Sequence, residues 1–467
     1  MGNELKKKYG LPTAIAMVVG IVIGSGVFFK AEAILNKTGG DLPLGILAWI
    51  IGGLIMIACS CAFAVMATKY EYVNGVVDYA DVTVGKKYGY FVGWFMATLY
   101  TPMLTGVLAW VSARYLCVLI GFDIVGPECL TISFFFLIAN YALNALSPKL
   151  GGKFQVSTTV IKLIPLILMA VVGTIVGLVS GMTVDNFTSA AVSAVNGSPL
   201  FGAVVATAFA YEGWIIATSI NAELKDAKKN LPKALLIGAA IIMAIYVFYY
   251  IGIAGAVDKT TMMESGEKAA RTAFSNIFSN VGGTILFVFI VISCLGTLNG
   301  LMMGCTRGFY ALAARGVGPK PEVFNKVDTQ TNMPTNSSVM GLLFAAFWLL
   351  YFYGANLTSP WFGPFCFDSS ELSIVTIYAL YIPMFVMFMK KEKDMNALHR
   401  FVLPILALCG SVFMVIAAIY AHGISISTKL LEMPIFYYLI VFVVVMAIGA
   451  FFSKPKNGVE SADINKK

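Results

Sequence analysis

Four charged side chains stand in or beside apolar stretches that are long enough to cross a bilayer: Arg114, Lys162, Glu212 and Glu371. A charge at the bilayer centre costs about 2.5–3.5 kcal/mol on insertion scales, so a charged residue there usually serves a functional site or a buried ion pair. Lys162 lies in the middle of its stretch, which favours a functional or tethering role. Arg114 lies about two turns from a helix end, and we expect its side chain to extend to water. Glu371 fits an interfacial position and a pocket equally well.

Two of the apolar stretches also contain patterns that interrupt a helix. The first is Gly-Ser-Gly at residues 24–26, and the second is Phe-Ala-Tyr-Glu-Gly-Trp at residues 209–214. Non-helical backbone is tolerated in a membrane only where it is buried in protein or lines a cavity. Glycine makes unwinding cheap and lets a ligand approach the backbone. The Gly-Ser-Gly pattern alone would fit a close helix contact equally well, but Glu212 inside the second break favours a binding site.

The two breaks occupy the first and sixth apolar stretches, 188 residues apart from residue 24 to residue 212. Interrupted helices at matching places in two halves indicate an inverted-repeat transporter with its site at the midplane. The exposed N–H groups of one half-helix can bind a carboxylate, and the carbonyls of the opposing half-helix can bind an ammonium group. An α-amino acid carries both groups close together. The breaks therefore predict this substrate class.

The composition is that of a membrane protein. The chain has 467 residues, of which 59% are hydrophobic and 12% are charged, whereas ordinary soluble domains are about 45–50% apolar and about 25% charged. This excludes a soluble enzyme, a disordered protein and a secreted disulfide scaffold. A spanning helix needs about 20 residues, and we expect twelve of them. They are residues 9–35, 42–68, 88–121, 129–147, 154–181, 198–222, 233–257, 281–313, 337–354, 369–389, 401–421 and 433–453.

The basic residues predict the orientation. With the amino terminus inside the cell, 24 of the 32 Lys and Arg residues fall on the cytoplasmic side, and six, Lys30 among them, fall outside. Cytoplasmic loops are rich in Lys and Arg, so we expect both termini to be cytoplasmic. The net charge of +8 is thereby explained without a nucleic acid partner. The longest outer loop, residues 258–280, is expected to contain a short interfacial helix.

Histidines and cysteines give no sign of a metal site or a redox motif. The two histidines, His399 and His422, stand near helix ends, and most of the eight cysteines lie inside apolar runs without a Cys-X-X-Cys spacing. Such cysteines usually act as small apolar side chains. We therefore expect no cofactor, and an intramembrane enzyme is disfavoured. A channel is also disfavoured, because one pair of broken helices is not a repeated pore-lining ring.

Several segments together resemble the amino acid–polyamine–organocation superfamily, and its L-type amino acid transporters and bacterial serine/threonine and small-neutral-amino-acid exchangers in particular. The matching segments are Gly20–Phe29, Phe154–Leu166, Phe209–Trp214, Asn230–Ala234 and Gly296–Arg315. The resemblance implies an all-α membrane fold of about twelve helices, with an inverted five-plus-five repeat whose helices 1 and 6 are broken. Residues 1–390 would form the core, residues 391–453 two additional helices and residues 454–467 a cytoplasmic tail.

The resemblance also implies roles for individual residues. Substrate would be bound at Val22, Gly24, Ser25, Gly26, Phe209, Ala210 and Glu212. Within this set, the N–H groups of residues 24–26 would hold the carboxylate, and the carbonyls of residues 22, 209 and 212 would hold the amino group. Phe209 would also close over the substrate as part of the outer gate. Lys162 would replace the sodium ion of coupled relatives and tether helices 1 and 8, and Tyr246 would lie near that lysine and the first break.

The chain also departs from the family pattern. Residues 73–80 contain one glycine where two adjacent glycines are usual, and Ala314-Arg315-Gly316 lacks the usual acidic residue. The carboxylate of Glu212 could hold a cationic substrate or a proton. We therefore expect a sodium-independent amino acid exchanger in a bacterial plasma membrane, working by alternating access without a partner subunit. A proton-coupled symporter and a carrier of polyamines or cationic amino acids remain as alternatives.

Overall fold

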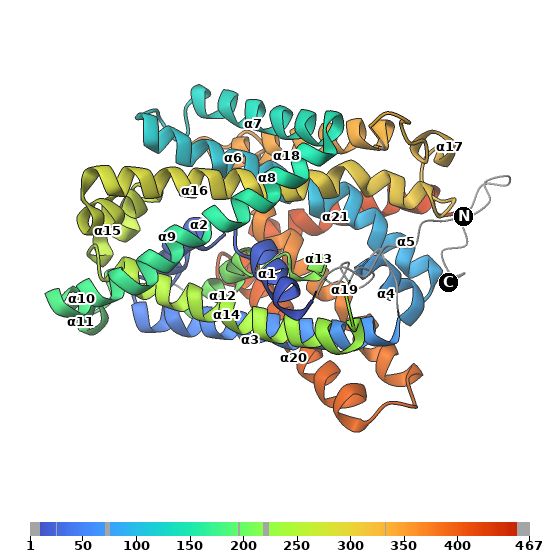
Figure 1. Cartoon of the computed structure of the whole chain (residues 1–467), viewed down its shortest axis with the longest axis horizontal. Helices are drawn as coiled ribbons and strands as arrows, with labels where there is room; N and C mark the ends of the chain where they lie inside the picture. Colours follow the sequence, from blue (N-terminus) through green and yellow to red (C-terminus); the bar gives the residue numbers. More distant parts are fainter. Residues whose placement is uncertain are drawn as a thin grey trace.

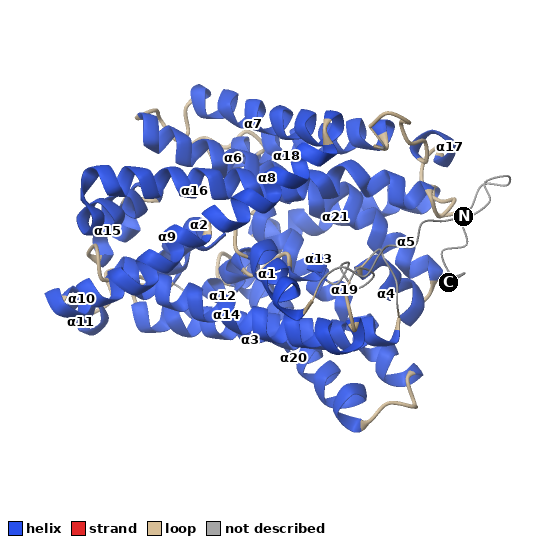
Figure 2. Cartoon of the chain, in the orientation of Figure 1, coloured by secondary structure: helices blue, strands red, loops and turns tan. Residues whose placement is uncertain are grey.

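The computed structural model describes residues 10–24, 26–70, 75–194, 197–217, 224–331 and 333–454. Ser25, predicted to bind substrate, lies outside these residues, as do residues 73 and 74 and all but the first residue of the predicted tail. Every regular element in the described part is a helix (Figure 2). This agrees with the predicted all-α fold.

Ten described helices are long and apolar enough to span a membrane. Some of these spans consist of several consecutive helical segments, as in α5–η1–α6 and α8–α9–η2–α10. The segments of the ten spans are α3 (Leu42–Lys69), α5 (Lys86–Phe95), η1 (Met96–Tyr100), α6 (Thr101–Ile120), α7 (Pro127–Leu146), α8 (Pro148–Ile161), α9 (Leu163–Leu168), η2 (Met169–Gly173), α10 (Thr174–Ser180), α14 (Ala227–Ala254), α16 (Glu267–Ala313), α18 (Thr335–Ala355), α19 (Ser369–Lys391), η5 (Leu398–Val402), α20 (Leu403–Ile419), η6 (Tyr420–Ile424) and α21 (Pro434–Phe451).

The first and sixth predicted spans are each divided into two helices. The first consists of α1 (Leu11–Val22) and α2 (Gly26–Lys37), and the sixth of α12 (Pro199–Ala210) and α13 (Trp214–Ala217). Ile23 ends α1 in an extended conformation, and Gly213 after α12 has a φ of 106°, which favours glycine. The broken helices are therefore confirmed. With the ten long helices, they account for the twelve predicted spans.

The turns between spans gather at two opposite ends of the molecule. At one end the backbone N–H of Gly318 donates to the carbonyl of Phe452, and Lys391 donates to the carbonyl of Val82. We call this the α17 end, after α17 (Pro321–Phe324), and it also holds α4 (Val76–Thr83) (Figure 1). The other end holds α15 (Lys259–Glu264) and α11 (Met182–Thr188) and is called the α15 end.

Contacts at the α15 end confirm the alternation of the spans. There the N–H of Val192 donates to the carbonyl of Gly39, and Tyr353 donates to the carbonyl of Val125. The half-helices α1 and α2 thus run toward the α15 end, whereas α12 starts at that end and runs away from it. The two broken spans are therefore oppositely directed, as an inverted repeat requires.

The predicted helix in the loop 258–280 is present, and it changes the interpretation of Arg114. The loop forms α15 and the first part of α16, which kinks at Phe278 and Ser279. Glu267 in this first part accepts a hydrogen bond of 2.8 Å from Arg114. The guanidinium also lies 4.4 Å from the ring centroid of Trp110. The expectation that Arg114 extends to water is therefore wrong, because its guanidinium pairs with the carboxylate of Glu267 inside the protein.

Small residues let the helices around the site approach closely. A Cβ on Gly106 of α6 would lie 2.6 Å from the backbone nitrogen of Leu349 in α18. A Cβ on Gly341 of α18 would lie 2.3 Å from the carbonyl oxygen of Cys305 in α16. Helix contacts in membranes depend on such small residues. The three helices therefore form a tightly packed support beside the broken spans.

Candidate substrate site

The two helix breaks lie against each other. A Cβ on Gly26, the first residue of α2, would lie 2.5 Å from the Cα atom of Ala210, the last residue of α12. A Cβ on Gly24 would lie 2.5 Å from the hydroxyl oxygen of Thr297 in α16. Glycine is thus required here by packing, and any approach of a ligand to the backbone adds to that requirement.

Tyr246 connects both breaks. This residue of α14 is completely buried, and its hydroxyl group lies 3.3 Å from the carbonyl oxygen of Val22 and 3.0 Å from that of Ala210. These carbonyls stand at the ends of α1 and α12, where no further helical turn supplies N–H groups to donate to them. One side chain therefore fixes the ends of both half-helices. The sequence had predicted only that Tyr246 lies near Lys162 and the first break.

Lys162 holds the first broken span. Its side chain is 1% exposed, and its ammonium group donates to the carbonyl of Gly20 in α1. The predicted second tether, to the eighth span, is not among the hydrogen bonds of the described residues. Instead, α8 approaches α16 through packing, since a Cβ on Gly296 would lie 2.3 Å from the hydroxyl oxygen of Thr158.

A cavity of about 460 Å³ begins at the breaks. Predicted site residues in its wall are Val22, Gly24, Gly26, Lys162, Phe209 and Glu212. From the breaks, the wall follows α16 from Thr297 to Ala311 and reaches Met96 in η1. Both Ala311 and Met96 lie on the side of the α17 end. The cavity therefore extends from the breaks toward the α17 end, and Phe209 lines it beside the breaks.

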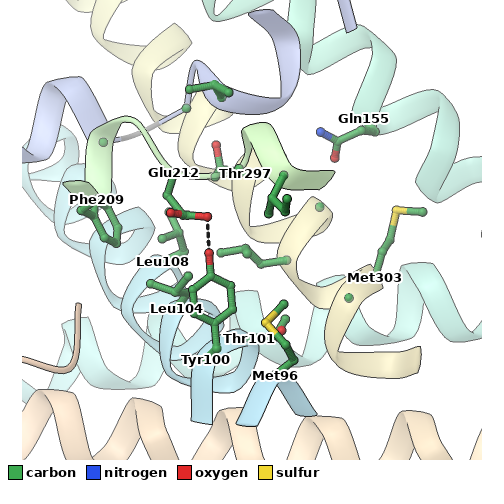
Figure 3. Close-up of a pocket in the computed structure, with 18 of the residues that line it drawn as sticks. Met96, Tyr100, Thr101, Leu104, Leu108, Gln155, Phe209, Glu212, Thr297 and Met303 are labelled. Atoms are coloured by element: carbon green, nitrogen blue, oxygen red, sulfur yellow. Dashed lines mark hydrogen bonds between the residues drawn. The ribbon is translucent and has the colours of Figure 1, made fainter. Parts of the chain in front are cut away.

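The carboxylate of Glu212 faces the cavity and accepts a hydrogen bond from the hydroxyl group of Tyr100. Figure 3 shows these two side chains pointing toward each other from different elements. Tyr100 ends the π-helical segment η1, directly before Thr101 and Pro102. The prediction missed Tyr100, although Pro102 was a signal, because a proline inside an apolar run disturbs the helix before it.

Amide side chains form a polar wall on another side of the cavity. Gln155, which lines the cavity (Figure 3), accepts a hydrogen bond of 3.0 Å from Asn299 in α16. Asn299 in turn accepts one of 2.9 Å from Asn144 in α7. This chain of amides joins three helices, and sequence reasoning did not identify it.

Aromatic and charged groups lie behind Phe209. The ring of Phe209 meets that of Phe29 edge to face, with centroids 5.8 Å apart. The ammonium group of Lys30 lies 5.4 Å from the centroid of Phe209. Lys30 is 3% exposed within α2, so counting it in an outer loop is wrong. It binds Glu371, which is buried and does not line the cavity.

The family model for amino acid permeases matches residues 9–447. The chain belongs to this family. Among related proteins, the serine/threonine exchanger SteT of Bacillus subtilis (strain 168) is 29% identical over 447 residues, which are 93% of this chain and 97% of SteT. The human b(0,+)-type amino acid transporter 1 is 24% identical over 89% of this chain and 83% of its own length.

A third relative is the large neutral amino acids transporter small subunit 2 of Homo sapiens. It is 26% identical over 71% of this chain and 62% of its own length. The match to the amino acid permease family extends over both broken spans and the helices that surround the cavity. The resemblance noted in the sequence is therefore confirmed, and this permease is an integral membrane protein.

Proposed function

We propose that this permease is a sodium-independent exchanger of α-amino acids that works by alternating access. The observation that carries the proposal is the meeting of two broken helix ends beside a cavity that extends to one side. Lys162 supports sodium independence, because its ammonium group already supplies a positive charge on the carbonyl of Gly20. A sodium ion bound there would have to displace that charge.

The substrate would lie at the breaks with its two charged groups on the backbone. The N–H groups at Gly24, Ser25 and Gly26 would hold its carboxylate, and the carbonyls at Val22, Phe209 and Glu212 would hold its amino group. Ala210 would contribute through packing against Gly26. Since Tyr246 already donates to the carbonyl of Val22, that carbonyl would use its second lone pair for the substrate.

The conformation would be the inward-facing one. Most Lys and Arg residues fall in turns of the α17 end, which favours a cytoplasmic position for this end. Both termini would then be cytoplasmic, in the plasma membrane of a bacterium. A cavity that extends to the α17 end would release substrate into the cell. The core of residues 1–390, with residues 391–453 as two additional helices, remains part of the proposal.

A second candidate is coupling to protons, and it rests on Glu212. Its carboxylate faces the cavity and accepts a hydrogen bond from the neutral phenol of Tyr100. A carboxylate in such a place can take up a proton or pair with a cationic substrate. Pairing would select lysine, arginine, ornithine or a polyamine, whereas protonation would couple neutral substrates to a proton gradient.

The experiment is uptake of labelled serine and of labelled lysine into proteoliposomes that contain only this chain. The exchanger requires that unlabelled amino acid inside the vesicle accelerate entry. Proton coupling instead requires accumulation driven by an imposed pH gradient with no amino acid inside. Activity of the chain alone would also support the absence of a partner subunit and of a cofactor. An ion leak independent of amino acid would indicate a channel, and chemical conversion of the tracer would indicate an enzyme.

A further inference from the structure

Three charged or titratable side chains form a buried cluster behind Phe209, outside the cavity. They come from three elements: Lys30 from α2, Glu371 from α19 and His422 from η6. Their exposed fractions are 3%, 2% and 6%. The ammonium of Lys30 lies 2.6 Å from one carboxylate oxygen of Glu371, and Nε2 of His422 lies 2.9 Å from the other. We call this group the Lys30–Glu371–His422 cluster.

Few other charges lie near the cluster. Asp368, at the start of α19, has a carboxylate oxygen 4.0 Å from the ammonium of Lys30, and Lys37 of α2 acts on Glu371 from farther away. The helices α12, α20 and α21, which pack against η6, contain no acidic or basic residue. Among the described groups, Glu371 is therefore the charged partner that faces His422.

The cluster joins α2, beside the breaks, to α19 and η6. Lys30 stands on α2, which packs against α12 next to the breaks, whereas Glu371 and His422 stand on α19 and η6. Lys30 also lies 5.2 Å from the ring centroid of Phe29 and 5.4 Å from that of Phe209. Opening at Phe209 by a movement of α2 would therefore withdraw the ammonium from Glu371.

We propose that the Lys30–Glu371–His422 cluster is a proton-controlled latch of the outer gate, an inference that rests on the proposed alternating access. In the closed gate, Lys30 neutralises Glu371. When α2 moves away, His422 takes up a proton from water and becomes the cation that pairs with Glu371. A buried carboxylate left without a cation is strongly unfavourable, so the gate opens more readily when His422 is protonated.

The sign of the pH dependence follows from this exchange of partners. An imidazole changes its charge within the range of about pH 5 to 8. While the imidazole is neutral, opening leaves Glu371 without a cation. Once the imidazole has taken up a proton, the imidazolium can pair with Glu371, and opening is easier. The exchange rate should therefore rise as the pH on the α15 side falls, while the KM for substrate changes little.

The test measures amino acid exchange by the full chain in proteoliposomes between pH 6 and pH 8, with His422→Gln and its matched control His399→Gln. These are the only histidines of the chain, and His399 lies in η5, away from the cluster. We expect at least a threefold faster maximal rate at pH 6 than at pH 8 for the wild type and for His399→Gln. His422→Gln should lose this difference and keep its KM. A wild type without the difference, or a His422→Gln variant that retains it, would overturn the latch.

A second variant and a second measurement test the latch independently of whether the protein transports amino acids. Glu371→Gln removes the charge that needs a cation, so it too should abolish the pH difference. Hydrogen exchange of the amides in residues 26–37, corrected for the intrinsic effect of pH, reports opening of α2 without any substrate. If this exchange is faster at pH 6 in the wild type but not in Glu371→Gln, the latch stands even for a protein that exchanges no amino acid. Equal hydrogen exchange in both would overturn it.

Discussion

At the scale of single residues, the site depends on side chains that satisfy the broken ends of helices. Lys162 donates to the carbonyl of Gly20, and Tyr246 shares its one hydroxyl proton between the carbonyls of Ala210 and Val22. A buried polar group that loses its partner costs about 1–3 kcal/mol. Substituting a side chain that bonds a broken helix end should therefore impair the protein more than substituting a similar side chain elsewhere in the same span.

Lys162→Ala should impair transport while the protein still inserts into the membrane. The change leaves the carbonyl of Gly20 without its ammonium partner, and the geometry of the first break is lost with it. We expect at least a tenfold lower exchange rate, measured at equal amounts of purified protein. Lys153→Ala is the matched control, since Lys153 is exposed in the same span. Equal rates in wild type and Lys162→Ala would remove the tether role.

Tyr246→Phe should destabilise the substrate site without creating a cavity, because the aromatic ring remains in place. It removes one hydroxyl group that serves two carbonyls, so we expect a loss of about 1–3 kcal/mol in stability or substrate affinity. Thermal unfolding in detergent and binding of substrate measure the two effects. Tyr250→Phe is the control, because the hydroxyl of Tyr250 is buried in the same helix and has no hydrogen-bond partner among the described residues. If both variants behave alike, Tyr246 does not organise the breaks.

Glu212→Gln should retain exchange of neutral amino acids within a few-fold, because an amide oxygen can still accept the hydrogen bond from Tyr100. Removal of the charge should weaken the binding of lysine, arginine or ornithine at least tenfold, or by about 1.4 kcal/mol. Alternatively, loss of pH dependence with neutral substrates would identify a proton site. The measurement is a competition panel across pH 5–8. A profile identical to that of the wild type would reject both roles of Glu212.

At the scale of helices, the breaks could be predicted because their causes are local. Glycines in residues 24–26 and Glu212-Gly213 are visible in the sequence, and the structure divides both spans there. The partners of the charged residues could not be predicted in the same way. Lys30 and Glu371 are 341 positions apart, and only the packing of α2 against its neighbours brings them together. The acidic partner of Arg114 was missed for the same reason.

Gly26→Ala should damage folding as well as transport. The new Cβ would lie 2.5 Å from the Cα atom of Ala210, so a backbone must move, at a cost of about 1–3 kcal/mol. We expect a lower unfolding temperature together with loss of substrate binding. Gly300→Ala is the control: this glycine also lines the cavity, but its Cβ would lie 3.5 Å from Gln155, an ordinary contact. Normal stability of Gly26→Ala would show that the breaks are less tightly packed than described.

At the scale of the whole molecule, the cavity extends to one side of the breaks, and a buried ionic cluster lies on the other side. The cavity extends from the breaks to the α17 end, and the Lys30–Glu371–His422 cluster lies on the other side of Phe209. The number and alternation of the spans could be predicted, since apolar length and loop charge determine them. The direction in which the cavity opens could not, because the same sequence must adopt both conformations during transport.

The most direct test of the proposed function is exchange of labelled amino acid in proteoliposomes that contain this chain alone, in sodium and in potassium medium. The substrates are serine and lysine, each tested with and without the unlabelled amino acid inside. We predict that internal amino acid accelerates entry at least tenfold for one of the two substrates, with equal rates in the two media. Uptake that requires a sodium gradient and ignores internal amino acid would contradict the account.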